Sequence, residues 1–241
     1  MPLRIGFDMD GTLADFASAF HDVEVRLFGP KSHIEAGQPE KEPEEEKEGV
    51  EGASVEKKKK AKKDGIKAAL ASHRRRDAVW NAIRSTPDFW NTLKPIDPDA
   101  VKRIHWLAIT HKWEVFFITQ RPYTDGETVQ RQTQHWLMAQ GYDMPSVLVI
   151  SGSRGAAAGA LRLDYHVDDS PQNCLDVISE SKARTILIVP EDDDVTRRQA
   201  RNLKMGTATS VTDALDVLEK ATLARTQPNL LDKIAILVGW K

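Results

Sequence analysis

The sequence has little cysteine, no long hydrophobic run and no marked excess of charge of either sign. Cys174 is the single cysteine among 241 residues, which excludes an internal disulfide and fits a reducing compartment. The longest late apolar run, residues 234–240, is far too short to span a bilayer. The first ten residues also lack the apolar segment of a signal peptide. We therefore expect a cytoplasmic protein without a membrane partner.

The near-balance of charge argues against one class of partner. Lysine and arginine total 34 against 36 aspartate and glutamate, a net charge of -2. Proteins that bind nucleic acid polymers usually carry a strong basic excess, so no such partner is expected. Hydrophobic residues make up 40% of the chain. The length and this fraction suit one large α/β domain, or a core domain with a small cap.

One stretch departs from this composition. Residues 40–63 form an acidic block followed by a basic block with almost no large apolar side chain. Such a segment buries too little surface to offset the entropy of ordering. We predict a disordered, solvated insert over about 36–64. The alternative is an electrostatic tether for a partner, continuing into the basic residues 73–76.

Short apolar runs alternate with helix-like stretches along the rest of the chain. Five runs are predicted strands: Leu3–Phe7, Val115–Ile118, Val147–Ile150, Tyr165–Val167 and Thr185–Val189. Helices are predicted at about 97–111, 125–140, 155–162, 171–182, 195–203 and 212–223. Several runs are apolar without alternation, as in strands covered on both faces. The order predicts an α/β fold built on a Rossmann-like, doubly wound parallel sheet.

The long interval between the first two predicted strands has a different character. Apart from the insert, residues 16–95 look helical, with one segment after Leu13 and another from about 66 to 84. We predict that residues 16–95 form a small helical cap above the sheet. Residues 1–15 and 96–241 then form the core domain.

Polar residues follow four of the predicted strands. Because ligands of such sheets bind outside the carboxyl ends of the strands, these residues should meet at one edge. In chain order they are Asp8 and Asp10; Thr119, Gln120 and Arg121; Ser151, Ser153 and Arg154; Asp168 and Asp169.

The four aspartates at this edge predict a divalent cation. Gathered together, their carboxylates repel one another unless a cation lies between them. Oxygen ligands without histidine or cysteine suit Mg²⁺. The predicted metal ligands are Asp8, Asp10, Asp168 and Asp169.

The same residues can carry out phosphoryl transfer. A carboxylate approaching a phosphate dianion at about 4 Å faces about 8 kcal/mol at an effective dielectric near 20, so the metal is required. Asp8 can then act as nucleophile, and Asp10 can donate a proton to the leaving group and later accept one from water. Thr119, Gln120 and Arg154 are the predicted phosphate-binding residues.

Three motifs resemble those of the haloacid dehalogenase-like hydrolase superfamily. They are "DMDGT" at 8–12, "VFFIT" at 115–119 and "YHVDD" at 165–169. The resemblance implies a Rossmann-like core, an aspartyl-phosphate on Asp8 and acid–base catalysis by Asp10. It also implies that Mg²⁺ is held by Asp8, the Asp10 backbone carbonyl and one of Asp168 and Asp169. An aspartate at position 10, which dehalogenases lack, favours phosphoryl transfer.

Two further stretches are similar to the 5'(3')-deoxyribonucleotidases of that superfamily. They are "DMDGTLADF" at 8–16 and "PDFWNTLKP" at 87–95. The resemblance implies that Phe16 stacks on a nucleobase and that Phe89 and Trp90 line the base pocket. Ordinary packing is the alternative for Phe89 and Trp90. It is the expectation for the other tryptophans considered, Trp80, Trp106, Trp113 and Trp136.

One element of the superfamily pattern is missing. Its third motif is normally a lysine, and no lysine lies between Lys112 and Lys182. Arg154 stands where that lysine is common, and Arg131 is the second candidate, while Arg162 is expected on a helix surface. An arginine stays charged and grips phosphate through two nitrogens, but it is larger than lysine.

These observations predict a Mg²⁺-dependent phosphomonoesterase acting on (deoxy)nucleoside monophosphates. One alternative is the same chemistry on another small phosphate ester, such as a sugar phosphate or phosphoglycolate. Another is a non-catalytic binding protein that keeps the fold. The missing lysine is its sole support, and the presence of both Asp8 and Asp10 counts against it.

Overall fold

A computed structural model describes residues 2–30, 71–225 and 238–239. The charged insert predicted at about 36–64 lies outside the described residues, as does the beginning of the second predicted cap helix. Within the described part of the chain, no helix is long and apolar enough to cross a membrane.

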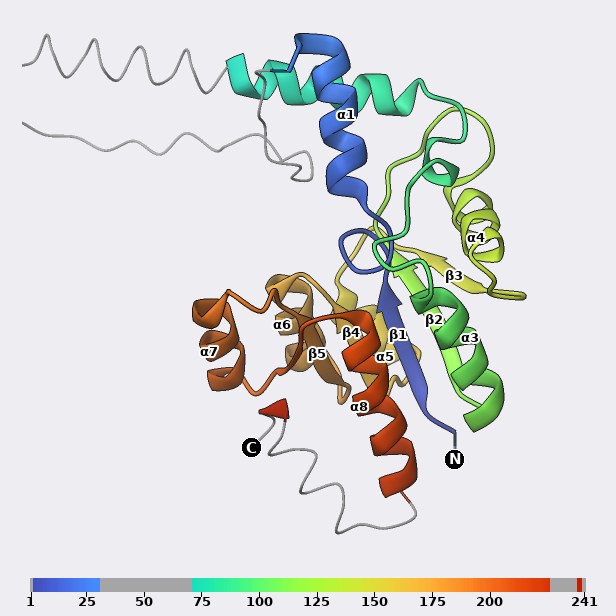
Figure 1. The fold of residues 1–241 in the computed structure, drawn as a ribbon, viewed down its shortest axis with the longest axis vertical. Coiled ribbons are helices and arrows are strands. Elements are labelled where there is room, and N and C mark those ends of the chain that lie inside the picture. The colour runs from blue at the N-terminus through green and yellow to red at the C-terminus, as the bar shows by residue number, and fades with distance from the viewer. Residues whose placement is uncertain (1, 31–70, 226–237, 240–241) are drawn as a thin grey trace, which may run out of the picture.

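The core of the molecule is one six-stranded parallel sheet, in the order β3-β2-β1-β4-β5-β6 (Figure 1). The strands are β1 (Arg4–Asp8), β2 (Glu114–Thr119), β3 (Ser146–Val149), β4 (Tyr165–Asp168), β5 (Arg184–Ile188) and β6 (Gly206–Ala208). The chain therefore has the predicted Rossmann-like α/β fold. The five predicted strands are present, and β6 was not predicted because its sequence, GTA, contains no apolar run.

The strand register places the motif residues at one edge. On β1, Phe7 lies opposite Phe117 of β2 and Val167 of β4. One residue further along each strand, Asp8 and Asp168 are therefore the last residues of two neighbouring strands. Reversal of the connection direction on either side of β1 leaves a crevice at this point, which is where such sheets bind ligands.

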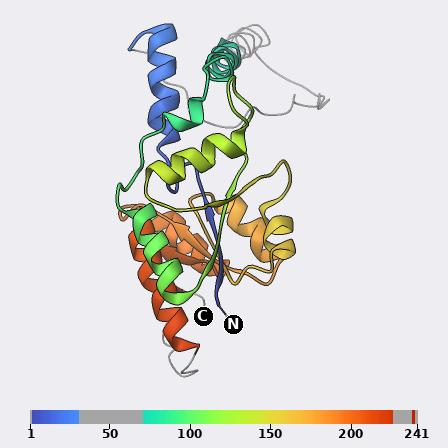
Figure 2. The ribbon, with the colours of Figure 1, turned by 90° about the vertical axis from the view of Figure 1, so that its right-hand side faces the viewer.

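Helices cover both faces of the sheet, which explains the continuous apolar strands. On one face, α3 (Ala100–His111) and α8 (Val211–Ala224) share the main core cluster with β1 and β4 (Figure 2). A second cluster joins β2 to α5 (Arg154–Ala160) and α6 (Pro171–Glu180). Within β2 the side chains alternate between these clusters, Phe117 entering the first and Ile118 the second.

The other two core helices are α4 (Val129–Ala139) and α7 (Asp194–Asn202). α4 begins four residues later than predicted, because Gly126 has a positive φ of 95° and Thr128 forms the N-cap. The Thr128 hydroxyl oxygen accepts a hydrogen bond from the Arg131 backbone N–H at 3.3 Å. A hydroxyl cap of this kind satisfies a backbone donor that a helix start leaves open.

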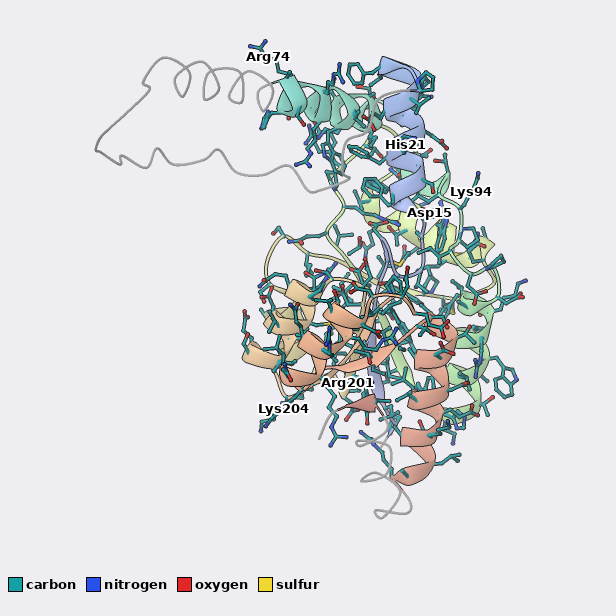
Figure 3. All side chains as sticks on the ribbon, turned by 60° about the vertical axis from the view of Figure 1, so that its left-hand side comes forward. Asp15, His21, Arg74, Lys94, Arg201 and Lys204 are labelled. Carbon is teal, nitrogen blue, oxygen red and sulfur yellow. The ribbon has the colours of Figure 1, made fainter. Side chains whose placement is uncertain are left out.

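Between β1 and α3 the described chain is largely helical and lies beyond the carboxyl end of β1 (Figure 1). It comprises α1 (Phe16–Phe28), a helix over 71–84 and a short 3₁₀ helix, η1 (Phe89–Asn91). At the start of α1, the Asp15 backbone N–H donates to the Lys94 carbonyl at 2.8 Å, and Figure 3 shows these two residues near each other. The boundaries proposed for a cap and a core stay a prediction.

Candidate active site

Three carboxylates meet where β1 and β4 end. Asp8, Asp168 and Asp169 each offer an oxygen, and these atoms all lie within 4.8 Å of one another. Asp8 is 4% exposed and Asp168 is fully buried. Ionised carboxylates this close and this poorly hydrated are unfavourable without compensating charge.

The pKa values of two of these carboxyl groups are raised as a result. Burial, reinforced by the charge of Asp168, raises the pKa of Asp8 well above its usual value, although Arg154 opposes the shift. Burial and the charge of Asp168 likewise raise the pKa of Asp169 to about 6, while a hydrogen bond from Thr12 opposes it. Perturbed carboxyls that face a cavity are typical of functional sites.

Asp168 is held by donors on several sides. The Ser170 backbone N–H donates to Oδ1 at 2.8 Å, and the Asn173 side-chain amide lies 3.1 Å from both oxygens. His166 Nε2 lies 2.9 Å from Oδ2, which fits an Nε2–H donor. These bonds fix the carboxylate in one orientation, as the outer partners of metal ligands commonly do.

The loop after β1 approaches the Asp169 carboxylate closely because it contains a glycine, Gly11. Gly11 has a φ of +90°, and a Cβ placed there would lie 2.2 Å from the nearer Asp169 oxygen. Thr12 Oγ1 donates to Asp169 Oδ1 at 2.9 Å. Any larger residue at position 11 would be strained and would displace this carboxylate.

This arrangement fits a divalent metal ion. The donor set is made of oxygens alone, which hard cations prefer. A bound cation would offset both the burial and the mutual repulsion that raise the pKa values of Asp8 and Asp169. The Asp10 carboxylate is not part of the group, because it is turned toward Arg121.

Arg154 lies beside the predicted nucleophile. It begins α5, and its Nη2 donates to Asp8 Oδ1, while its Nε lies 3.8 Å from Asp168 Oδ2. The side chain is 5% exposed, and neither Nε nor Nη1 makes a hydrogen bond with a described residue. A buried guanidinium with unused donors is a ready partner for an anion.

Arg121 is a site residue to which the sequence analysis assigns no role. Its Nε and Nη2 donate to both oxygens of Asp10, the shortest contacts being 2.8 and 2.7 Å. The side chain is fully buried, and its guanidinium carbon lies 4.8 Å from the centre of the Trp90 ring. A cation directly after the predicted strand was a usable signal, but an arginine there is ordinarily solvent-exposed.

The two polar residues before Arg121 occupy different positions. Thr119, buried at the end of β2, lies 3.4 Å from Asp10 Oδ2 through its hydroxyl. Gln120 lines the cavity and donates to the Gly152 carbonyl at 3.3 Å. Both therefore lie at the predicted edge, although Gln120 is already engaged in a backbone contact.

A cavity of about 530 Å³ opens over these groups, between the sheet edge and the helices beyond it. Aromatic side chains form one side of it, and we call Phe16, Trp80 and Trp90 the aromatic wall. Phe16 stacks on Trp80 at 5.4 Å with a tilt of 27°, and lies 5.6 Å from Trp90. The other lining residues are Asp8, Asp10, Gln120, Arg121, Pro122, Arg154, Asp169, Ser170, Gln172 and Asn173.

Three aromatic residues differ from expectation. Phe89 does not line this cavity, because it packs edge-on against Trp90 and faces a separate hollow beside α1. Trp80, expected to be an ordinary packing residue, belongs to the aromatic wall because the helix over 71–84 lies against Phe16. Of the remaining tryptophans, Trp113 and Trp136 are buried as expected, whereas Trp106 is 59% exposed on α3.

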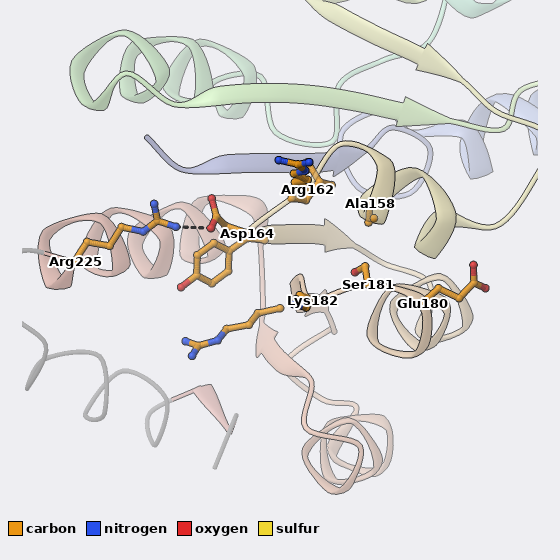
Figure 4. Close-up of a pocket in the computed structure, with 11 residues that line it drawn as sticks. Ala158, Arg162, Asp164, Glu180, Ser181, Lys182 and Arg225 are labelled. Atoms are coloured by element: carbon orange, nitrogen blue, oxygen red, sulfur yellow. Dashed lines mark hydrogen bonds and ion pairs between the residues drawn. The ribbon is translucent and has the colours of Figure 1, made fainter. Parts of the chain in front are cut away.

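The other arginines considered for the missing lysine lie elsewhere. Arg131 is on the surface of α4, where it pairs with Glu127 at 2.5 Å. Arg162 lines a hollow at the opposite, amino-terminal end of the sheet, shown in Figure 4 and called here the amino-end hollow. Of these three arginines, Arg154 alone contacts the carboxylate cluster.

Comparisons with known proteins identify the fold. No protein-family model matches the sequence, and no curated protein matches it. Among solved structures, a haloacid dehalogenase-like family hydrolase from Streptococcus pneumoniae has a TM-score of 0.51 at 15% identity, covering 90% of this chain and 98% of its own.

Two other similar structures have lower scores. A family IA, variant 3 hydrolase from Entamoeba histolytica has a TM-score of 0.48 at 14% identity, covering 88% of this chain and 94% of its own. The L-2-haloacid dehalogenase of Xanthobacter autotrophicus has 0.46 at 11%, covering 91% and 99%. With the sheet order above, the match to the Streptococcus protein shows that this chain has the fold of haloacid dehalogenase-like hydrolases.

Proposed function

We propose that this protein is a Mg²⁺-dependent phosphomonoesterase acting on (deoxy)nucleoside monophosphates. One observation carries the proposal. The buried carboxylate of Asp8 lies beside Asp168, Asp169 and Arg154, and two buried nitrogens of Arg154 have no hydrogen-bond partner among the described residues. The cluster thus combines a nucleophile, an oxygen site for a cation and unused donors for an anion, next to one cavity.

In the first step, an Asp8 carboxylate oxygen attacks the phosphorus of the ester. The bond between phosphorus and the ester oxygen breaks as the new bond to Asp8 forms, which leaves an aspartyl-phosphate. The departing alkoxide takes a proton from the Asp10 carboxyl and leaves as an alcohol. Asp10 lines the same cavity as Asp8, so both groups can reach one substrate.

In the second step, water attacks the phosphorus of the aspartyl-phosphate. Asp10, now ionised, accepts the proton of that water, and the bond between phosphorus and the Asp8 oxygen breaks. Free phosphate leaves, and both aspartates return to their starting protonation states. The contact from Arg121 to both Asp10 oxygens keeps the carboxyl group in one place through both steps.

Asp8 and one or both of Asp168 and Asp169 would hold Mg²⁺. When bound, the ion offsets the negative charge of the phosphate and of the attacking carboxylate. Arg154 brings a second positive charge to the same place through Nε and Nη1. The Thr119 side chain adds a hydroxyl group at the last residue of β2. These groups are the ones we assign to the phosphoryl oxygens.

The aromatic wall supports a nucleotide as substrate. Trp80 and Trp90 are almost fully buried, whereas Phe16 is partly exposed and braced by both of them. Phe16 therefore offers a rigid apolar surface to a planar group. Stacking of a base on an aromatic ring contributes about 1–3 kcal/mol and depends little on which base it is.

A panel of phosphorylated metabolites tests the proposal. Purified protein with millimolar Mg²⁺ should release phosphate from nucleoside monophosphates faster than from sugar phosphates or phosphoglycolate, and EDTA should abolish the release. A preference for the other esters would refute the nucleotide substrate while keeping the chemistry. No release from any ester would refute the phosphatase itself and favour a binding protein.

A further inference from the structure

We infer that Arg121 is a positioning residue that holds Asp10 in its working orientation, and this rests on the acid–base role proposed for Asp10. Arg121 lies two residues after the end of β2 and contacts Asp10, whose carboxylate is not part of the carboxylate cluster. We assign Arg121 no direct contact with a phosphoryl group. What it supplies is a fixed orientation for the proton-transfer group.

The contact between the two side chains leaves Asp10 little rotational freedom. Arg121 Nε donates to Asp10 Oδ2 at 2.8 Å and Oδ1 at 3.1 Å, and Nη2 donates to Oδ1 at 2.7 Å. A two-pronged contact fixes the plane of the carboxylate as well as its position. Without it, rotation of Asp10 would move its oxygens away from the leaving group, and general acid–base catalysis requires hydrogen-bond reach.

Arg121 is itself held on two further sides. Nη1 donates to Thr133 Oγ1 at 3.0 Å, and this hydroxyl donates to the Val129 carbonyl at 2.8 Å within α4. The guanidinium also lies over the Trp90 ring at 4.8 Å. The arginine is therefore locked between the first turns of α4 and the aromatic wall.

Trp90 cannot easily move away from this position. Its backbone N–H donates to Gln132 Oε1 at 3.1 Å, and its indole Nε1–H donates to the Pro122 carbonyl at 3.0 Å. Pro122 directly follows Arg121 in the chain, and Gln132 directly precedes Thr133, which is a partner of Arg121. The side of the cavity that carries the proton-transfer group is thus a connected, hydrogen-bonded unit.

The burial of the Arg121 side chain argues against a purely structural role for this residue. The Arg121 side chain is fully buried, and among the described residues Asp10 is the one carboxylate that forms an ion pair with it. A buried arginine is costly unless it is paired, and here its partner is an acid that faces the cavity. A salt bridge that served stability alone would not require a carboxylate that faces the substrate cavity.

The inference predicts a dependence on the leaving group. An alkoxide departing from a nucleotide or from glycerol phosphate needs a proton from Asp10, whereas p-nitrophenolate leaves well without one. Loss of Arg121 should therefore slow leaving-group release from the first two substrates far more than from p-nitrophenyl phosphate, whereas hydrolysis of the aspartyl-phosphate, which needs Asp10 as base, should slow equally for all three. A defect confined to base binding would instead slow the nucleotide alone.

The experiment measures the single-turnover rate of leaving-group release, with enzyme in excess over substrate, for Arg121→Ala, Arg121→Lys and Thr133→Val with those three substrates at saturating Mg²⁺. For Arg121→Ala we expect this rate on a nucleoside monophosphate and on glycerol phosphate to fall by about 100-fold or more, with the half-saturating enzyme concentration within about 3-fold of wild type. On p-nitrophenyl phosphate the rate of leaving-group release should fall by less than about 5-fold. Arg121→Lys and Thr133→Val should show the same pattern at smaller amplitude.

Two controls separate positioning from general damage. Arg103→Lys alters an arginine that bridges α3 to Asp216 of α8, far from the cavity, and should leave all three rates unchanged. Guanidinium ion in the buffer should restore part of the activity of Arg121→Ala. An equal fall in the rate of leaving-group release on all three substrates, or no fall, would overturn the inference. If wild-type protein hydrolyses none of them, the proposed function fails instead.

Discussion

The two ends of the parallel sheet each carry a hollow, and the larger one is not the candidate site. The amino-end hollow measures about 670 Å³, against about 530 Å³ for the cavity at the carboxyl end. It is lined by four cations, Arg162, Lys182, Arg184 and Arg225, and two acids, Asp164 and Glu180 (Figure 4). Cavity volume and the number of charged lining residues alone would favour the amino end.

Burial and pairing separate the two places. At the amino end, Arg225 pairs with Asp164, and about a third of each side chain is exposed. At the carboxyl end, Arg154 and Asp8 are each 5% exposed in their side chains, and Arg154 keeps unused donors. Exposed pairs are screened by water and contribute little, whereas buried groups with unmet hydrogen bonds need a ligand. Buried charged groups with unmet hydrogen bonds therefore indicate a functional site better than the volume of a cavity does.

The largest difference between the two ends should appear on replacing one aspartate at each. Asp8→Asn removes the nucleophile and should lower kcat/KM by at least about 1000-fold. Asp164→Asn, at the amino end, should leave kcat/KM unchanged and lower the thermal midpoint slightly, because its partly exposed ion pair is weak. Steady-state assays and thermal melts of both variants measure this. Comparable losses of activity would erase the distinction between the two ends.

Arginines at the two ends should differ nearly as much. Arg154→Met removes the buried cation beside Asp8 and should lower kcat/KM by about 100-fold, as loss of a phosphate-binding donor commonly does. Arg154→Lys should recover part of that loss, since it restores the charge. Arg162→Met at the amino-end hollow is the matched control and should be silent. Full activity of Arg154→Met would remove Arg154 from the phosphate site.

Metal binding should stabilise the protein through the carboxyl end alone. At 100 times its dissociation constant, Mg²⁺ contributes about 2.7 kcal/mol, or about 5–10 °C in thermal midpoint for a chain of this length. The shift should disappear with EDTA and shrink strongly in Asp169→Asn, but persist in Asp164→Asn. Scanning calorimetry with and without Mg²⁺ measures it. A shift that depended on Asp164 would place the cation at the wrong end.

The smallest effect concerns substrate selectivity. Phe16→Ala removes the partly exposed ring of the aromatic wall and should raise KM for nucleoside monophosphates by about 5- to 150-fold, the equivalent of about 1–3 kcal/mol. Hydrolysis of glycerol phosphate should stay as it was. Tyr165→Phe, in the amino-end hollow, serves as the aromatic control. If Phe16→Ala affected both esters alike, the ring would be structural and the case for a nucleotide would weaken.

The carboxyl end of the sheet could be predicted from the sequence because its signal is local. Apolar runs ending in Asp8, Thr119 and Asp168 specify both a strand and its last residue. Parallel pairing then brings those residues to one edge without further information. The substitution of arginine for the usual lysine was also visible, and Arg154 lies against Asp8.

The place of Trp80 in the aromatic wall and the Arg121 contact could not be predicted in this way. Trp80 is remote in sequence from its neighbour Phe16, so no pattern joins the two. Arg121 gains its role from three partners on different segments, Asp10, Trp90 and Thr133. A long-range contact of this kind depends on how the helices beyond the sheet pack, which periodicity does not encode.

A crystal structure grown with Mg²⁺ and beryllium trifluoride, which mimics a phosphoryl group on aspartate, tests the central claim most directly. The account predicts beryllium bonded to an Asp8 oxygen, with Mg²⁺ at about 2.1 Å from Asp8 and from Asp168 or Asp169. Arg154 should contact the fluorides. Density for the metal elsewhere, or an Asp8 that stays bare at saturating concentrations of both ions, would contradict it.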